Sequence, residues 1–123
     1  LLGCSKHPIG LDLERHDRMI PAASILQRAY SQEERERLQH LQGEDLRRAV
    51  LKHWLIKEAS IKWQQGAIAR DLRFWEVRPG MRSVVHQRSH QRLSAALHAH
   101  DSWEFAVVAT DQQLLQSIRL FLT

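Results

Sequence analysis

Polar and apolar residues alternate near the start of the chain, in residues 9–14 (IGLDLE). A period of two is typical of a strand that packs one face against a core. Asp12 and Glu14 leave one face of this strand, because side chains two residues apart share a face. The apolar side chains leave the other face: Ile9, Leu11 and Leu13. The pattern predicts a strand over Ile9–Glu14, and Leu1–Cys4 could form a strand before it.

Two short helices are predicted next. Pro21 begins the first, which runs to Tyr30. Ser31 is followed three residues later by Glu34, and this spacing is the capping box that begins many helices. The second helix is expected to run from this cap to about Leu41.

The longest helical segment is predicted over Glu44–Gln65. Gly43 separates it from the preceding helix, and Gly66 is expected as its C-cap. One row of side chains repeats every four residues and is apolar: Leu51, Leu55, Ala59 and Trp63. A neighbouring row begins apolar and becomes charged: Leu46, Val50, Trp54, Glu58 and Lys62. The first row predicts packing against a core, and the charged end of the second is either a solvated surface or part of a site.

After residue 66 the period changes to that of strands. Four strands are predicted: Leu72–Val77, Ser83–Gln87, Arg92–His100 and Trp103–Thr110. A terminal helix is expected over Asp111–Leu122, with Asp111 as its cap. This order predicts one α+β domain over residues 1–123, in which the long helix packs against an antiparallel sheet.

The composition is that of a globular protein: 43% of the 123 residues are hydrophobic and 26% are charged. No apolar run approaches the roughly 20 residues of a membrane-spanning helix, and no signal peptide is visible. The single cysteine, Cys4, cannot form an internal disulfide, which favours a cytoplasmic location. The net charge of +4 favours an acidic partner.

The carboxylates of the first strand are candidates for a metal site. Asp12 and Glu14 lie roughly 7 Å apart along the backbone, and they repel one another unless a cation lies between them. Mg²⁺ prefers such oxygen ligands and keeps water for substrate phosphates. The alternative is a pair of solvated acids on the exposed face of a half-buried strand.

Three charges of the long helix form a second candidate group. Glu58 and Lys62 have the spacing of an exposed helix ion pair. Trp54 lies one turn earlier on the same row, which indicates a partly buried cleft instead. In such a cleft Glu58 could be a third metal ligand, and Lys57 and Lys62 could bind phosphate.

Two other groups of residues allow different functions. His98 and His100 share a strand face beside Asp101, which is a weak zinc pattern without a CxxC or HExxH motif. The most basic segment, Arg78–Arg92, could bind nucleic acid or an acidic protein, but it lacks the interleaved aromatic residues that stack on bases.

Two motifs resemble those of the 4'-phosphopantetheinyl transferases. Residues 10–14, GLDLE, resemble the family's G-(I/V)-D-(I/V)-E strand, and residues 54–62, WLIKEASIK, resemble its W-(S/T)-x-K-E-(A/S)-x-x-K helix. Residues 30–34, YSQEE, resemble the F-S-x-x-E segment between them. The resemblance covers about Ile9–Gly66. It departs from the pattern at Leu55, where the family has Ser or Thr, and at Ala67, where a second glycine is common.

The resemblance implies a fold and an activity. These enzymes transfer the phosphopantetheine arm of coenzyme A to a serine of an acyl or peptidyl carrier protein. By resemblance, Asp12, Glu14 and Glu58 would hold Mg²⁺, and Lys62, with Lys57, would bind the phosphates of coenzyme A. Glu58 and Lys62 would be the catalytic residues, with Glu58 the candidate base for the carrier serine. Neither a nucleic acid nor a membrane is expected as a partner.

The resemblance is to one half of the larger, two-half members of the family. The chain is similar to their C-terminal half, and nothing in it matches the S-H-S motif of their first half. We therefore expect either a missing N-terminal half or a homodimer. The alternatives are a catalytically inactive, truncated relative of the same fold and a small basic nucleic-acid-binding module. Retained binding of Mg²⁺ and coenzyme A would count against the first, and indifference to DNA would count against the second.

Overall fold

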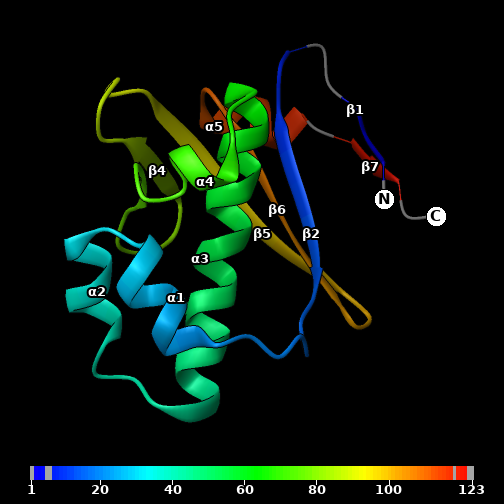
Figure 1. Ribbon diagram of the computed structural model, residues 1–123. Coiled ribbons are helices and arrows are strands. Elements are labelled where there is room, and N and C mark those ends of the chain that lie inside the picture. The colour runs from blue at the N-terminus through cyan, green and yellow to red at the C-terminus, as the bar shows by residue number, and fades with distance from the viewer. Residues whose placement is uncertain (1, 5–6, 118, 122–123) are drawn as a thin grey trace.

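The computed structural model describes residues 2–4, 7–117 and 119–121 (Figure 1). The elements in chain order are β1 (Leu2–Cys4), β2 (Gly10–Arg15), α1 (Ala22–Ala29), α2 (Gln32–Leu38), α3 (Gly43–Gln64), α4 (Ile68–Asp71), β3 (Trp75–Val77), β4 (Ser83–His86), β5 (Arg92–His100), β6 (Trp103–Ala109), α5 (Gln112–Ser117) and β7 (Arg119–Phe121). This arrangement confirms the expected α+β class, with a long helix and an antiparallel sheet.

The main sheet has five strands in the order β2-β6-β5-β4-β3, and each neighbouring pair is antiparallel. Strand β2 therefore forms one edge, next to β6, although it is the first of these five strands in the chain. Strands β1 and β7 form a separate antiparallel pair at the side of the molecule (Figure 1). Helix α3 runs across one face of the main sheet, and α1 and α2 lie against α3 (Figure 1).

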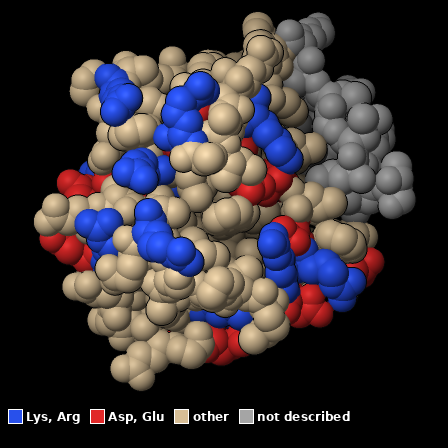
Figure 2. Space-filling view, viewed as in Figure 1, with Lys and Arg blue, Asp and Glu red and all other residues tan. Residues whose placement is uncertain are grey.

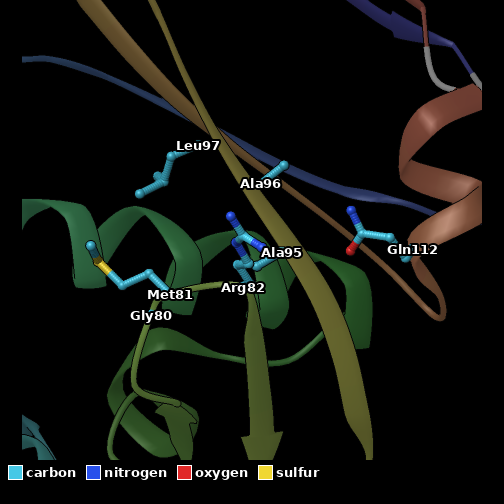
Figure 3. A pocket seen from close by; sticks show the side chains of 7 residues that line it. All are labelled: Gly80, Met81, Arg82, Ala95, Ala96, Leu97 and Gln112. Atoms are coloured by element: carbon cyan, nitrogen blue, oxygen red, sulfur yellow. The ribbon is translucent and has the colours of Figure 1, made fainter.

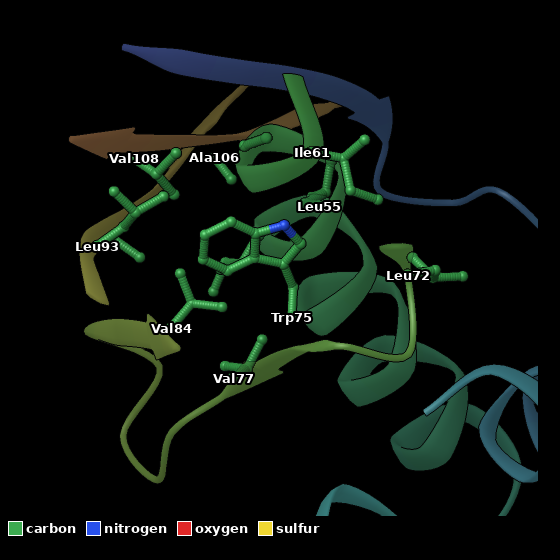
Figure 4. Close-up of a cluster of buried hydrophobic side chains, with 12 residues drawn as sticks. Leu55, Ile61, Leu72, Trp75, Val77, Val84, Leu93, Ala106 and Val108 are labelled. Atoms are coloured by element: carbon green, nitrogen blue, oxygen red, sulfur yellow. The ribbon is translucent and has the colours of Figure 1, made fainter. Parts of the chain in front are cut away.

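Helix α3 is enclosed between the sheet and the two short helices. Trp75 lies at the centre of the cluster between α3 and the sheet, surrounded by aliphatic side chains (Figure 4). A second cluster joins α1 and α2 to the first half of α3, through Leu26, Tyr30 and Val50. Buried positions consequently occur around most of the helix circumference, so its apolar rows do not distinguish an inner face from an outer one.

The capping box predicted at Ser31 is present. The Ser31 side chain accepts from the backbone N–H of Glu34, and the Glu34 side chain accepts from the backbone N–H of Ser31. The helix that follows ends at Leu38 rather than Leu41. At the end of α3 the expectation for Gly66 was wrong, because Gln65 is the left-handed C-cap, with φ of 60°.

Two expectations for the second half of the chain also need correction. The strand expected over Leu72–Val77 begins only at Trp75, because α4 occupies residues 68–71 and Asp71 accepts from the backbone N–H of Ala67. The terminal helix expected over Asp111–Leu122 ends at Ser117, and the chain then pairs as β7 with β1. Residues 118, 122 and 123 lie outside the described residues.

Strand β2 places its polar side against α3. Gly10 lies directly against the helix, since a Cβ atom there would be 1.9 Å from the carbonyl oxygen of Ala59. Asp12 is two residues further along the same face and is buried. The apolar side chains of Leu11 and Leu13 leave the other face and are half-buried. The fold thus turns the carboxylate row toward the long helix.

Candidate active site

The candidate site lies where β2 passes α3. The contact between Gly10 and Ala59 brings the two backbones together without an intervening side chain. Asp12 follows this contact on the same strand face, and its relative exposure is 5%. A buried carboxylate is costly unless a positive charge or hydrogen-bond donors compensate it. The surroundings of Asp12 therefore determine what this site can bind.

Lys62 provides one such charge. Its Nζ atom donates to Oδ1 of Asp12 at 2.6 Å, across a sequence separation of fifty residues. The Lys62 side chain is 57% exposed, so its ammonium group remains accessible to an anionic ligand. The other oxygen of Asp12, Oδ2, is buried and accepts no hydrogen bond among the described residues. One side of Asp12 is thus neutralised by a lysine, and the other is left for a further cation or donor.

Glu58 lies beside Asp12 and is half-buried. Burial, and then the nearby charge of Asp12, raise the pKa of Glu58 from 4.5 to about 7. Lys62 opposes this rise, and Glu14 adds to it. When Glu58 is protonated, its carboxyl group can donate to Asp12. When both groups are ionised neither can donate, which leaves two adjacent negative charges that favour a cation.

Glu14 belongs to the same neighbourhood but has a partner of its own. It forms an ion pair with Arg18 at 2.5 Å. Arg18 follows β2 in a turn held by Arg47 of α3, whose Nη1 donates to the carbonyl oxygens of His16 and Arg18. Neither arginine was recognised in the sequence, because nothing in the local pattern links position 47 to a turn near position 16.

Lys57 does not lie at this site. Its side chain is completely buried on another side of α3, where Nζ donates to Oε1 of Glu34 at 2.5 Å. Burial lowers the pKa of Lys57, and the charge of Glu34 opposes this shift. A phosphate at the surface cannot reach an ammonium group in this position. The structure thus brings together Asp12, Glu58 and Lys62, and it places Lys57 in a structural pair.

The residues at the site fit a divalent cation in part. Within residues 7–117, no three His, Cys, Asp or Glu side chains are arranged as a ready-made metal site. Asp12 and Glu58 nonetheless have the chemistry of magnesium ligands, since the unpartnered Oδ2 of Asp12 is a free ligand atom and both groups need a positive charge. Glu14 could join them through Oε1, since its ion pair with Arg18 uses Oε2.

Charged side chains gather over the junction of α3 and β2, as Figure 2 shows. A pocket of about 740 Å³ lies elsewhere, beside β5 (Figure 3). Met81 and Leu97 lie on one side of the strand in this view, and Gln112 of α5 lies on the other. Its lining includes Arg82 of the basic segment Arg78–Arg92, but none of the candidate metal or phosphate-binding residues, and it contains no carboxylate. The cluster at Asp12, unlike this pocket, combines carboxylates with an exposed lysine.

A comparison with protein families matches residues 8–114 to the 4'-phosphopantetheinyl transferase superfamily. The chain belongs to this superfamily. The match covers most of the 123 residues and includes β2, α3 and the whole five-stranded sheet. It supports transfer of phosphopantetheine as the general activity. No curated protein sequence matches the chain.

No helix in the described part of the chain has the length and apolar character needed to cross a membrane.

Proposed function

We propose that this chain catalyses the Mg²⁺-dependent transfer of the 4'-phosphopantetheine arm from coenzyme A to a serine of an acyl or peptidyl carrier protein. The observation that carries the proposal is the grouping of Asp12, Glu58 and Lys62 at the contact between β2 and α3. These residues come from the two motifs that resemble the family, and the family match supports the same general reaction.

Asp12 and Glu58 would hold the metal ion through their carboxylate oxygens. Bound Mg²⁺ would supply a positive charge that withdraws electrons from the diphosphate of coenzyme A. Lys62 lies beside Asp12 with an exposed ammonium group, so it can bind a phosphate oxygen and stabilise the negative charge that grows on the leaving group. Phosphoryl transfer of this kind depends mainly on positioning and on electrostatic stabilisation.

Glu58 is the candidate base for the serine hydroxyl. A general base must lie within reach of the proton that it takes, and Glu58 has two carboxylate oxygens, so that one could hold the metal ion while the other accepts the proton. The proton would move from the serine oxygen to a Glu58 oxygen as that serine oxygen attacks the β-phosphorus. The released product is adenosine 3',5'-bisphosphate.

The charge balance of the chain suits these substrates. Its net charge of +4 attracts both coenzyme A and an acidic carrier protein. Because Lys57 is buried, however, the α3 motif contributes only the accessible charge of Lys62 to the nucleotide. This supports the further proposal that an N-terminal half or a second copy of the chain supplies the remaining contacts to the nucleotide.

The experiment is a transfer assay with coenzyme A and an apo carrier protein, read by the mass of the carrier. We expect transfer with Mg²⁺, none after chelation, and a loss of at least about 100-fold in Asp12→Ala and Glu58→Ala. Arg48→Met, which removes an exposed charge of α3, is the matched control and should transfer normally. Normal transfer after removal of both carboxylates would show that the site is wrong. Binding of Mg²⁺ and coenzyme A without any transfer would favour a missing half, and loss of both binding and transfer would favour an inactive relative.

A further inference from the structure

We propose that the buried pair of Lys57 and Glu34 is a positioning element that orients α3, so that Glu58 faces Asp12. This inference rests on the proposed function, because Lys57 and Glu34 would support the metal ligands without touching the metal ion themselves. Both residues belong to segments that resemble the family motifs, yet neither has a place in the chemistry described above.

Glu34 joins three elements through one carboxylate. Its Oε1 accepts from Nζ of Lys57 at 2.5 Å and from the backbone N–H of Ser31 at 2.9 Å. Its Oε2 accepts from the backbone N–H of Val77 at 3.0 Å. The side chain is completely buried. The carboxylate therefore ties α3 to the beginning of α2 and to the edge strand β3.

Lys57 is held as closely as its partner. Its Nζ lies 4.3 Å from the centre of the Tyr30 ring, and the side chain has no exposed surface. Tyr30 is itself anchored, because its hydroxyl donates to the carbonyl oxygen of Val50 at 2.7 Å. A buried ammonium group with these partners cannot turn toward solvent without losing the ion pair and the ring contact.

The connection to the candidate site comes from sequence adjacency. Lys57 and Glu58 are consecutive on α3, so their side chains leave the helix about 100° apart. Lys57 points to α2 and β3, and Glu58 points to β2. At the next residue of α3, Gly10 packs against the backbone of Ala59. A rotation of α3 that carried Glu58 away from Asp12 would have to break the pair with Glu34.

Stability alone does not explain this pair. Replacing a buried ion pair by uncharged side chains of similar size is often neutral or stabilising, because the pair no longer has to be desolvated. A pair that only stabilised the fold could thus be replaced without consequence. A pair that orients α3 could not be replaced in this way, because uncharged side chains at positions 34 and 57 would not hold the helix in one orientation.

The test compares Lys57→Met/Glu34→Gln with the wild-type chain. The double substitution keeps the side-chain lengths and removes both buried charges. We expect a melting temperature within about 5 °C of the wild type, together with a 10–100-fold weaker Kd for Mn²⁺, which is about the loss seen when groups that orient metal ligands are removed. The Mg²⁺ concentration for half-maximal transfer should rise by the same factor. Arg48→Met on the same helix should change neither quantity.

The single substitution Lys57→Met leaves Glu34 buried without a counter-charge, so we expect its melting temperature to fall by more than about 10 °C. If the double variant does not fold, Lys57→Arg keeps the charge but changes the reach of the side chain, and it should also weaken Mn²⁺ binding. A folded variant of either kind that binds Mn²⁺ with the wild-type Kd would overturn the inference.

Mn²⁺ binding separates this inference from the proposed function. A wild-type chain that binds Mn²⁺ in an Asp12-dependent manner but transfers nothing would contradict the proposed function only. A wild-type chain that shows no Asp12-dependent binding would contradict both.

Discussion

A methyl group on Gly10 would lie 1.9 Å from the carbonyl oxygen of Ala59, so the strand of the candidate site touches the backbone of the long helix directly. The same methyl group would lie 2.8 Å from Val108 on the neighbouring strand. A backbone carbonyl in the middle of a helix cannot move aside as a flexible side chain can. Only glycine allows β2 to approach α3 this closely.

We therefore predict that Gly10→Ala lowers the free energy of unfolding by about 3 kcal/mol, the upper end of the usual cost of overpacking. It should also weaken metal binding, because Asp12 moves away from Glu58. Gly80→Ala is the control, since Gly80 has φ of 87° but no neighbouring atom within 4 Å, and its cost should be about 1 kcal/mol. Urea denaturation measures both values, and equal losses would contradict the steric explanation.

Ser31→Ala should destabilise the chain by about 2–4 kcal/mol. Ser31 caps α2, and its hydroxyl also donates to Oε1 of Glu76 at 2.7 Å. Glu76 is buried, so the substitution removes a cap and leaves a buried carboxylate oxygen with one donor fewer. Ser24→Ala on α1, where the hydroxyl accepts from Arg28 at the surface, should change stability by less than about 0.5 kcal/mol. Thermal unfolding of the two variants side by side tests this difference.

The raised pKa of Glu58 predicts how stability depends on pH. Between its ordinary value of 4.5 and about 7, the folded chain holds more proton on Glu58 than the unfolded chain does. The contribution of Glu58 to stability therefore falls as the pH rises through this window. Glu58→Gln should remove this part of the dependence, while Glu36→Gln, on the exposed side of α2, should not. The urea midpoints of both variants and the wild type at about pH 5 and about pH 7.5 measure this dependence. The same change in midpoint for the wild type and Glu58→Gln would contradict the prediction.

Lys62→Met should lower both stability and transfer. Lys62 is more than half exposed but Asp12 is buried, so loss of the ion pair leaves a buried carboxylate without its donor and should cost about 1–3 kcal/mol. Transfer from coenzyme A should fall by about 100-fold, because the growing negative charge loses a partner. Lys52→Met is the control. Lys52 lies on α3 six residues before Glu58, and this variant should retain normal transfer. A Lys62 variant with unchanged transfer would remove this residue from the catalytic assignment.

Much of the fold could be predicted because its signals are local. The capping box at Ser31 depends on residues three apart, and it appears as expected. The long helix and the strands of the meander follow from side-chain periods of a few residues. Some errors are local, such as the C-cap of α3, but the terminal helix is an error that a distant partner explains. The terminal helix stops at Ser117 because the chain beyond it pairs with β1, which lies more than a hundred residues away in the sequence.

The candidate site shows the same division. The sequence alone determined that Asp12 and Glu14 share one face of a strand and that Lys57, Glu58 and Lys62 share a helix. Only the tertiary structure decided that the polar face of β2 turns to α3, that Glu14 pairs with Arg18, and that Lys57 is buried against Glu34. The physical reason is that α3 is enclosed from both sides. When a helix has neighbours around most of its circumference, periodicity cannot tell which of two lysines meets solvent, and the partners on the adjoining elements decide it.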